Sequence, residues 1–306
     1  MTSPGHIAFI VNPAAGRGKV QHLLPRLRSI LEHSGLDHEF HLTAGPGDAT
    51  QLARKASDRS SIIVAVGGDG TVNETASGVA GTSAAMAVLS EGSGNDFARM
   101  IGAPKDPQKL LLQLQAPVIE PYDTGTVRLM HADGTETERS FFNSIGIGFD
   151  AAVAKNVASI RNLRGIPLYL TALLKTMKGY RPHPITVRYN GKAFSDDFFL
   201  LCAGNGKWEG GGFMLTPNAV PDDGMFEVCC VTGRSIAAIL PILPFVMIGK
   251  HIGKPHITMF TSNAITVECA DGFPVHGDGE ILGWKVVSAE IGIRARSLNV
   301  VIAHNR

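Results

Sequence analysis

The stretch Val66-Gly67-Gly68-Asp69-Gly70-Thr71-Val72-Asn73-Glu74 joins an apolar run to a helix through three glycines and one carboxylate. The residues before the glycines, 61–66 (SIIVAV), are of the kind that forms a strand covered on both faces, and we expect a helix to open at Thr71. Glycines at such a corner permit positive φ and close approach of a ligand, and the N–H groups of a helix start attract anions. The turn therefore predicts a phosphate site at which Asp69 holds a cation, most suitably Mg²⁺. A tight turn capped by an aspartate fits the same letters, and the stretch alone leaves both interpretations open.

Length and composition limit the class of protein. A chain of 306 residues is long enough for two domains, each with its own core, and the net charge of +1 gives no sign of nucleic-acid binding. Four cysteines without C-x-x-C spacing predict reduced thiols and therefore a cytoplasmic protein. The apolar run near the N-terminus is too short for a signal peptide, and no apolar run reaches the length of a membrane-spanning helix. We expect a soluble protein or one peripheral at the inner face of the membrane.

The first part of the chain alternates strand, loop and helix, which predicts a parallel sheet with right-handed crossovers. The expected strands are 6–11, 38–43, 61–66 and 84–89, and the expected helices are 20–33, 48–56 and 96–102. The carboxyl ends of such strands face one crevice, where ligands bind. The loop at 12–19 is not a P-loop, because Pro13 stands where the first glycine is needed and Val20 follows Lys19.

After residues 116–118 helical spacing gives way to alternation. We expect a hairpin of 124–131 with 136–148, a second hairpin within 185–203 that turns at Asn190-Gly191, and strands at 225–231, 264–269, 284–293 and 298–303. Helices are expected at 150–160, 166–179 and 235–249. The predicted fold class is α/β with two domains: a doubly wound α/β nucleotide-binding domain at 1–120 and a mainly antiparallel β-sandwich at 121–294.

Three motifs in this order, VNPAAGRGK (11–19), GGDGTVNE (67–74) and GSGNDFAR (92–99), resemble the diacylglycerol-kinase catalytic family, in particular its bacterial lipid kinases. The resemblance runs from about residue 6 to the C-terminus. It implies an ATP-dependent kinase that phosphorylates a lipid hydroxyl, most directly that of diacylglycerol, with Mg²⁺ and ATP as cofactors. It also implies that 295–306 returns to complete the first domain.

The resemblance assigns nucleotide contacts to sixteen residues: Asn12, Pro13, Ala14, Ala15, Gly16, Thr43, Gly67, Gly68, Asp69, Gly70, Thr71, Val72, Asn73, Glu74, Ser93 and Asn95. Thr43 also fits an ordinary strand end, and Asn95 fits a helix cap. Glu91 departs from the family pattern, because it places a charge where an apolar residue usually lies, and its effect on nucleotide binding stays open.

Two further features are assigned by the resemblance. The carboxylate of Asp223 and the carbonyls of Val220 and Met225 match a structural Mg²⁺ site, all with hard oxygen donors. Glu280 matches the general base, so Glu280 and Asp69 are the expected catalytic residues. An Asp-Gly turn before a strand explains the 220–225 loop equally well from its letters.

Several alternatives accompany this interpretation. The acceptor could be a sphingoid lipid, phosphatidylglycerol or NAD, since NAD kinase shares the GGDGT turn; Asn73-Glu74 directly after the turn favours the lipid family. A non-catalytic nucleotide-binding regulator of lipid metabolism is the other alternative. The apolar run 236–248, which Lys250 and Lys254 follow, is expected to pack on the sandwich, with membrane contact as the second interpretation. The sequence leaves open a homodimer.

Overall fold

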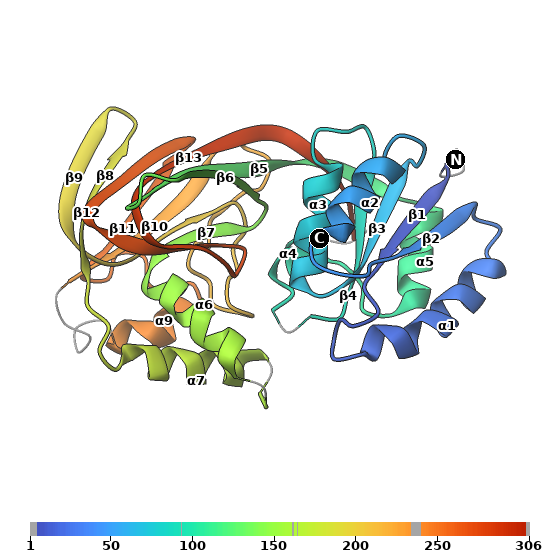
Figure 1. Ribbon diagram of the computed structural model, residues 1–306, viewed down its shortest axis with the longest axis horizontal. Coiled ribbons are helices and arrows are strands. Elements are labelled where there is room, and N and C mark those ends of the chain that lie inside the picture. The colour runs from blue at the N-terminus through green and yellow to red at the C-terminus, as the bar shows by residue number, and fades with distance from the viewer. Residues whose placement is uncertain (1–4, 93, 161, 164, 234–239, 304–306) are drawn as a thin grey trace. The chain divides into compact units, whose positions relative to one another are not determined.

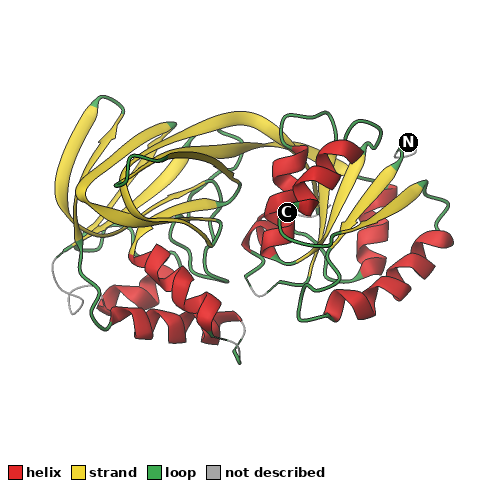
Figure 2. Ribbon diagram, viewed as in Figure 1, coloured by secondary structure: helices red, strands yellow, loops and turns green. Residues whose placement is uncertain are grey.

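The computed structural model describes residues 5–92, 94–160, 162–163, 165–233 and 240–303 (Figure 1). The chain divides into two compact units. Unit 1 comprises Met1–Tyr122 together with Arg296–Arg306, and unit 2 comprises Asp123–Ala295. The expected fold class, α/β followed by a β-rich second part, is confirmed (Figure 2).

A parallel sheet with the strand order β2-β1-β3-β4-β13 forms the centre of unit 1. Residues of β1, β3 and β4 are buried throughout, as the apolar runs predict for strands covered on both faces, whereas β2 lies at an edge and is partly exposed. The strands are β1 (Ile7–Val11), β2 (His38–Leu42), β3 (Ile62–Gly67), β4 (Ala85–Ser90) and the end of β13 (Glu280–Ile302).

The helices of unit 1 are α1 (Lys19–Glu32), α2 (Asp48–Ala56), α3 (Asp69–Val79), α4 (Asp96–Met100) and α5 (Pro107–Gln115). Helix α3 begins at Asp69, so the expectation that it opens at Thr71 was two residues late. Helix α5, which the sequence analysis did not single out, has a clear start: Asp106 accepts a hydrogen bond from the Gln108 N–H, and Pro107 occupies the first turn.

Unit 2 is built mainly from antiparallel strands. Strand β9 pairs with β10, β7 and β8, and β12 pairs with β13, β7 and β8. Inward-facing side chains such as Phe141, Phe198 and Phe273 form its main apolar core. The strands are β5 (Val118–His131, which begins in unit 1), β6 (Glu136–Phe141), β7 (Ser144–Gly148), β8 (His183–Tyr189), β9 (Lys192–Gly204), β10 (Phe226–Thr232), β11 (Ile257–Ser262), β12 (Ala264–Gly277) and β13.

The helices of unit 2 lie on one side of its strands (Figure 1): α6 (Phe149–Ser159), α7 (Gly165–Met177), the 3-10 turn η1 (Leu240–Ile242) and α9 (Leu243–Met247). The expected helix at 235–249 is present only as η1 and α9 where it is described; residues 234–239 lie outside the described residues. Strand β11 was not expected. Within the described parts of the chain, none of the helices combines the length and the hydropathy that crossing a bilayer requires.

Helices α2 and α3 pack through a glycine. A Cβ atom at Gly78 would lie 2.5 Å from the Thr50 carbonyl oxygen and 2.7 Å from the Ala53 Cβ. Gly78→Ala should therefore force these helices apart and lower the free energy of unfolding by about 1–3 kcal/mol, measured by urea denaturation. Ser77→Ala, on the same helix, is the control, and equal stability of both variants would contradict this tight contact.

Candidate active site

The loops after β1, β3 and β4 meet at one end of the unit 1 sheet. Strand β1 has β2 on one side and β3 on the other, so the strand order reverses its direction at β1. The crevice between the ends of β1 and β3 is therefore the topological switch point. Two contacts join the loops there: the Asn12 N–H donates to the Val66 carbonyl at 3.0 Å, and the Asn12 side-chain amide donates to Thr71 Oγ1 at 3.0 Å. The glycine-rich turn at 66–74 thus lies where open α/β sheets bind ligands.

Asp69 links the turn after β3 to the loop after β4. Its carboxylate accepts the N–H of Asn95 at 2.7 Å and that of Gly94 at 3.2 Å. A Cβ atom at Gly92 would lie 2.7 Å from Asp69 Oδ2, so this approach requires glycine. A carboxylate has about four lone-pair sites, and these two N–H bonds leave acceptor capacity for a cation.

The loop after β1 is held in the same place. Asn12 Oδ1 accepts the Ala14 N–H at 3.1 Å, and a Cβ atom at Gly16, where φ is 62°, would lie 3.0 Å from the Glu91 carbonyl oxygen. The backbone of the first loop therefore packs against the start of the β4 loop. This contact places Glu91 beside the glycine loop.

Glu74 has a structural task in this unit. Its carboxylate accepts the N–H of Gly47 at 2.9 Å and of Ala49 at 3.1 Å, which satisfies the start of α2, a helix whose own N-cap is a glycine. These hydrogen bonds explain a glutamate at this position without any ligand. A direct contact of Glu74 with nucleotide therefore stays a prediction.

The remaining predicted nucleotide contacts fall on the same loops. Thr43, just after β2, donates its N–H to the Val11 carbonyl at 2.9 Å. Gly67 must be glycine, because a Cβ atom there would lie 2.6 Å from Thr71. Ser93 lies outside the described residues. The other predicted contacts follow β1, open α3 or precede α4: Pro13, Ala15, Gly68, Gly70, Val72, Asn73 and Asn95.

In unit 2, the expected metal loop is tied to a carboxylate that the sequence analysis missed. The buried Asp123 accepts the Gly224 N–H at 2.7 Å, and its own N–H donates to the Pro221 carbonyl at 2.7 Å. Asp223 is exposed, and its Oδ1 accepts the Met225 N–H at 2.9 Å, as in an Asx turn. A carboxylate and backbone carbonyls on one such loop are oxygen donors that fit Mg²⁺.

Glu280 begins β13, directly opposite Gly277, and is exposed. A second missed carboxylate, Asp278, anchors this hairpin: it accepts the N–H groups of Phe142, Asn143 and Ser144 at 2.8–3.0 Å. Burial raises the pKa of Asp278, and those three hydrogen bonds oppose the rise. The hairpin that presents Glu280 is therefore fixed to the turn between β6 and β7.

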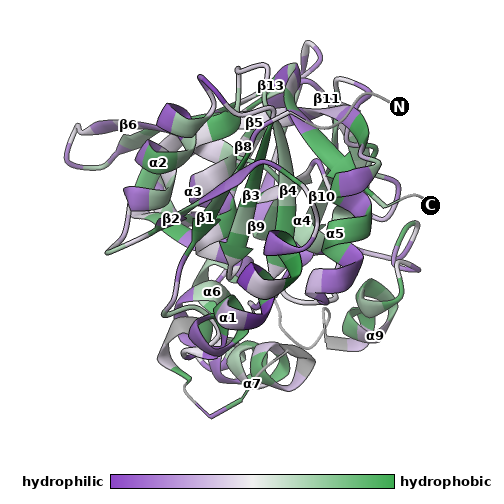
Figure 3. Ribbon diagram, turned by 90° about the vertical axis from the view of Figure 1, so that its right-hand side faces the viewer, coloured by the Kyte–Doolittle hydropathy of each residue, from purple (hydrophilic) through white to green (hydrophobic). Residues whose placement is uncertain are grey.

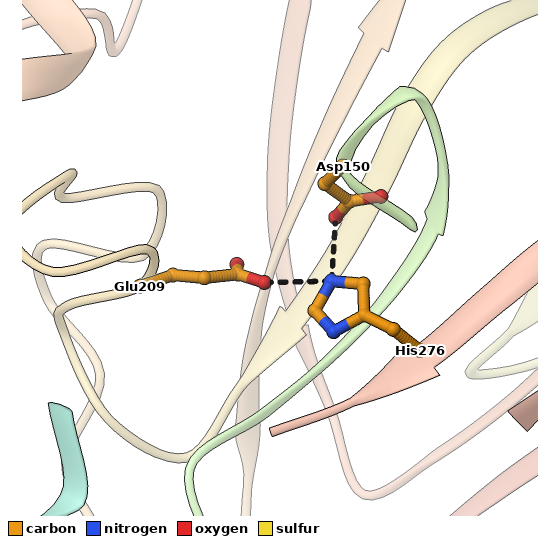
Figure 4. Close-up of side chains that lie close together, drawn as sticks. All are labelled: Asp150, Glu209 and His276. Carbon is orange, nitrogen blue, oxygen red and sulfur yellow. Dashed lines mark ion pairs between the residues drawn. The ribbon is translucent and has the colours of Figure 1, made fainter. Parts of the chain in front are cut away.

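A cluster of the buried His276 with the nearly buried Asp150 and Glu209 lies in the same unit (Figure 4). His276 Nε2 is 2.8 Å from Glu209 Oε1 and 3.5 Å from Asp150 Oδ2. Asp150 lies in the first turn of α6 and Glu209 lies in the loop after β9, so no sequence spacing joins the three residues. The cluster ties both elements to the β12–β13 hairpin.

The pKa values of His276 and Asp150 indicate whether this cluster is an ion cluster or a metal site. Burial alone lowers the pKa of His276, but Glu209 and Asp150 outweigh burial and raise it to about 10. The pKa of Asp150 rises to about 6, mainly through burial. In the neutral ring, Nδ1 accepts the Gly279 N–H at 3.2 Å and the proton sits on Nε2; the charged ring carries a second proton on Nδ1 and gives up that hydrogen bond. Because Nε2 carries a proton in both states, the group fits a buried ion cluster better than a metal site.

Two family models together match most of the chain. The model of the diacylglycerol kinase catalytic domain matches residues 6–127, and that of the YegS C-terminal NAD kinase beta sandwich-like domain matches residues 143–302. A diacylglycerol kinase of Bacillus subtilis (strain 168) is 28% identical over 280 residues, with 90% of this chain and 89% of the relative covered. A probable lipid kinase YegS-like protein of Stenotrophomonas maltophilia (strain K279a) is 30% identical over 237 residues, with 74% of each chain covered.

Solved structures agree on the fold. A diacylglycerol kinase from Bacillus anthracis str. Sterne has a TM-score of 0.71 at 22% identity, with 99% of each chain covered. Yeast NADH kinase has a TM-score of 0.57 at 11% identity, with 98% of this chain and 84% of that chain covered.

The chain belongs to the diacylglycerol kinase family of bacterial lipid kinases, as the resemblance of its three motifs predicted. It is a kinase-type enzyme of the lipid-kinase class.

The ion cluster predicts a pH dependence of stability. A pKa raised by folding stabilises the fold fully below its ordinary value of about 6.5, and this stabilisation is lost as the pH rises towards 10. The free energy of unfolding of the wild type should therefore fall between pH 6.5 and 10 more steeply than that of His276→Gln, measured by urea denaturation. The control is His22→Gln, which removes an exposed histidine of α1. Parallel curves for wild type and His276→Gln would exclude a charged His276.

The oxygen donors of the 220–225 loop predict metal-dependent stability. Asp223→Ala should lower the melting temperature and abolish most of the stabilisation that excess Mg²⁺ gives the wild type, because an ion that binds only the folded state adds stability by mass action. Asp222→Ala, at the neighbouring exposed carboxylate, is the control. Equal melting shifts with Mg²⁺ in wild type and Asp223→Ala would leave only the turn interpretation.

Proposed function

We propose that this enzyme transfers the γ-phosphoryl group of Mg²⁺-ATP to a lipid hydroxyl, most directly converting diacylglycerol to phosphatidic acid. The observation that carries the proposal is the convergence of the loops after β1, β3 and β4 around Asp69 at the switch point. The relatives named as diacylglycerol or lipid kinases support the acceptor class.

On the nucleotide side, the chain supplies positioning and charge. Glycines at 67, 68 and 92 let the backbone approach the phosphates closely, and the start of α3 presents its N–H groups to anions. Phosphoryl transfer requires alignment and neutralisation of charge more than covalent chemistry from the protein. Mg²⁺ held by Asp69 would neutralise charge on the phosphates, and Asp223 with the carbonyls of Val220 and Met225 would hold a second, structural ion.

On the acceptor side, Glu280 takes the proton of the attacking hydroxyl. It is exposed at the start of β13, while Asp278 and the ion cluster hold its hairpin in place. A carboxylate committed to Mg²⁺ is a poor base, because the cation lowers its pKa, so Asp69 and Glu280 have different roles. The four cysteines are all buried and free, which supports the cytoplasm as the compartment.

The fold shared with yeast NADH kinase keeps a dinucleotide as the second candidate acceptor. A panel of diacylglycerol, a sphingoid base, phosphatidylglycerol and NAD with labelled ATP separates these acceptors. Phosphorylation of NAD but of no lipid would overturn the proposal. Nucleotide binding without transfer to any acceptor would favour a non-catalytic regulator.

Two substitutions separate the catalytic roles. Glu280→Gln keeps the shape but cannot accept a proton, so kcat should fall by about 10² or more while the affinity for ATP stays nearly unchanged. Asp69→Asn should reduce turnover by several orders of magnitude and also weaken binding of Mg²⁺-ATP. Single-turnover rates and nucleotide titrations measure both effects.

The control for these variants is Glu290→Gln, which removes another exposed carboxylate of β13. Normal turnover of Glu280→Gln would exclude Glu280 as the base. More than about a tenth of the wild-type rate in Asp69→Asn at saturating Mg²⁺ would exclude Asp69 as the ligand of the catalytic ion.

A further inference from the structure

Glu280 directly follows a two-residue hairpin turn, Asp278-Gly279. Strands β12 and β13 pair at Gly277 and Glu280, and φ is 50° at Asp278 and 85° at Gly279. Positive φ at both central residues is typical of a type I′ turn. The two central N–H groups of such a turn take no part in the strand ladder, so each needs water or an acceptor from elsewhere in the chain.

Both central N–H groups of this turn have an acceptor in the chain. The Asp278 N–H donates to the Ser144 carbonyl at 2.9 Å, and the Gly279 N–H donates to His276 Nδ1 at 3.2 Å. A carbonyl accepts at every pH, whereas an imidazole nitrogen accepts only while it carries no proton. The backbone directly before Glu280 is therefore held by one hydrogen bond that depends on the protonation of His276.

The surroundings of His276 fix the orientation of its ring. The residue is 2% exposed, and Nε2 lies 2.8 Å from Glu209 Oε1 and 3.5 Å from Asp150 Oδ2 (Figure 4). Gly146 makes room for this arrangement, because a Cβ atom there would overlap both Nε2 and Asp150 Oδ2. The ring is thus held with Nε2 towards the two carboxylates and Nδ1 towards the turn.

Charged groups from three elements act on the proton of this ring. Asp150 belongs to α6, most of which is hydrophobic (Figure 3), Glu209 lies in the loop after β9, and Asp278 lies in the turn itself. The second oxygen of Glu209 accepts the Cys202 thiol at 3.1 Å. Glu209 and Asp150 raise the pKa of His276 to about 10, whereas the hydrogen bond from the turn favours the neutral ring. The ring therefore changes from charged to neutral as the pH rises towards 10.

We propose that His276 is a positioning residue for Glu280: its neutral ring binds the Gly279 N–H and fixes the backbone that carries the base, and a proton on Nδ1 releases it. The inference rests on the proposed function for the role of Glu280 as base. A charged ring has N–H groups at both nitrogens, so the Gly279 N–H then faces a donor. Turnover should therefore increase as the pH rises, although the ion pairs of His276 stabilise the fold less over the same range.

Two substitutions imitate the two ring nitrogens. The side-chain oxygen of His276→Asn takes the place of Nδ1 and accepts the Gly279 N–H at every pH, whereas the amide of His276→Gln takes the place of Nε2 and leaves the turn without that acceptor. The kcat of His276→Asn should exceed that of His276→Gln about fivefold, equivalent to one hydrogen bond of about 1 kcal/mol, with equal KM values. Between pH 6.5 and 10 the wild-type kcat should pass from the level of His276→Gln to that of His276→Asn. The control His22→Gln should follow the wild type.

NMR of the wild type tests the hydrogen bond to the turn without any substitution and without turnover. In protein with isotope-labelled histidine and glycine, the neutral ring of His276 should carry its proton on Nε2. The Cα shift of Gly279 should change with the same midpoint as the ring nitrogens of His276. Gly191 is the matched control, because the Asn190-Gly191 turn also joins two paired strands with positive φ at both residues, 47° and 73°. Its shift should not follow the titration of His276.

The inference is overturned if the Gly279 shift ignores the titration of the ring, or if the neutral ring carries its proton on Nδ1. It is also overturned if His276→Asn and His276→Gln lose turnover equally at every pH, because His276 would then only stabilise the interior of unit 2. Failure of the proposed reaction gives a different result: neither the wild type nor any variant phosphorylates an acceptor, while the shifts of Gly279 and His276 still change together.

Discussion

The carboxylate of Asp69 is the constraint on which the candidate site depends. By accepting the N–H groups of Gly94 and Asn95, it fixes the loop after β4 against the turn after β3. This contact in turn requires glycine at position 92, because any side chain would collide with the carboxylate. The arrangement places one negative charge among backbone N–H groups and leaves part of its capacity for a cation. The parallel sheet supplies the strand ends, but Asp69 determines how their loops meet.

The acidic residues of the chain divide according to burial. Asp123, Asp278, Asp150 and Glu209 are buried or nearly so and bind backbone N–H groups or a histidine, as the cost of burying a charge requires. Asp223 and Glu280 are exposed on loops that those buried groups hold. In each case a buried carboxylate fixes the backbone beside an exposed one. This division explains how a loop and a hairpin turn can each present a group in one position.

The sequence predicts the fold well where an apolar strand pattern is bounded by a recognisable turn or glycine loop. The strands before the glycine loops and the hairpin at Asn190-Gly191 follow from short-range chemistry, and the structure has them at nearly the expected residues. The ion cluster was not predictable, since Asp150, Glu209 and His276 are brought together only by tertiary packing. The structural roles of Glu74 and Asp123 were not predictable either, because their carboxylates accept N–H groups 25 to 101 residues away in the sequence. Long-range contacts of this kind leave no periodic signal.

Strand β13 links the two units in a way that matters during synthesis. It begins at Glu280 in unit 2, and residues 299 and 300 pair with β4 in the sheet of unit 1. Until these residues leave the ribosome, β4 has an unpaired edge on that side, although β1 to β4 have been complete for some 200 residues. Exposed, apolar strand edges promote association with other chains. The nascent protein therefore carries an open sheet through most of its translation, and chaperone binding at that edge would protect it until β13 arrives.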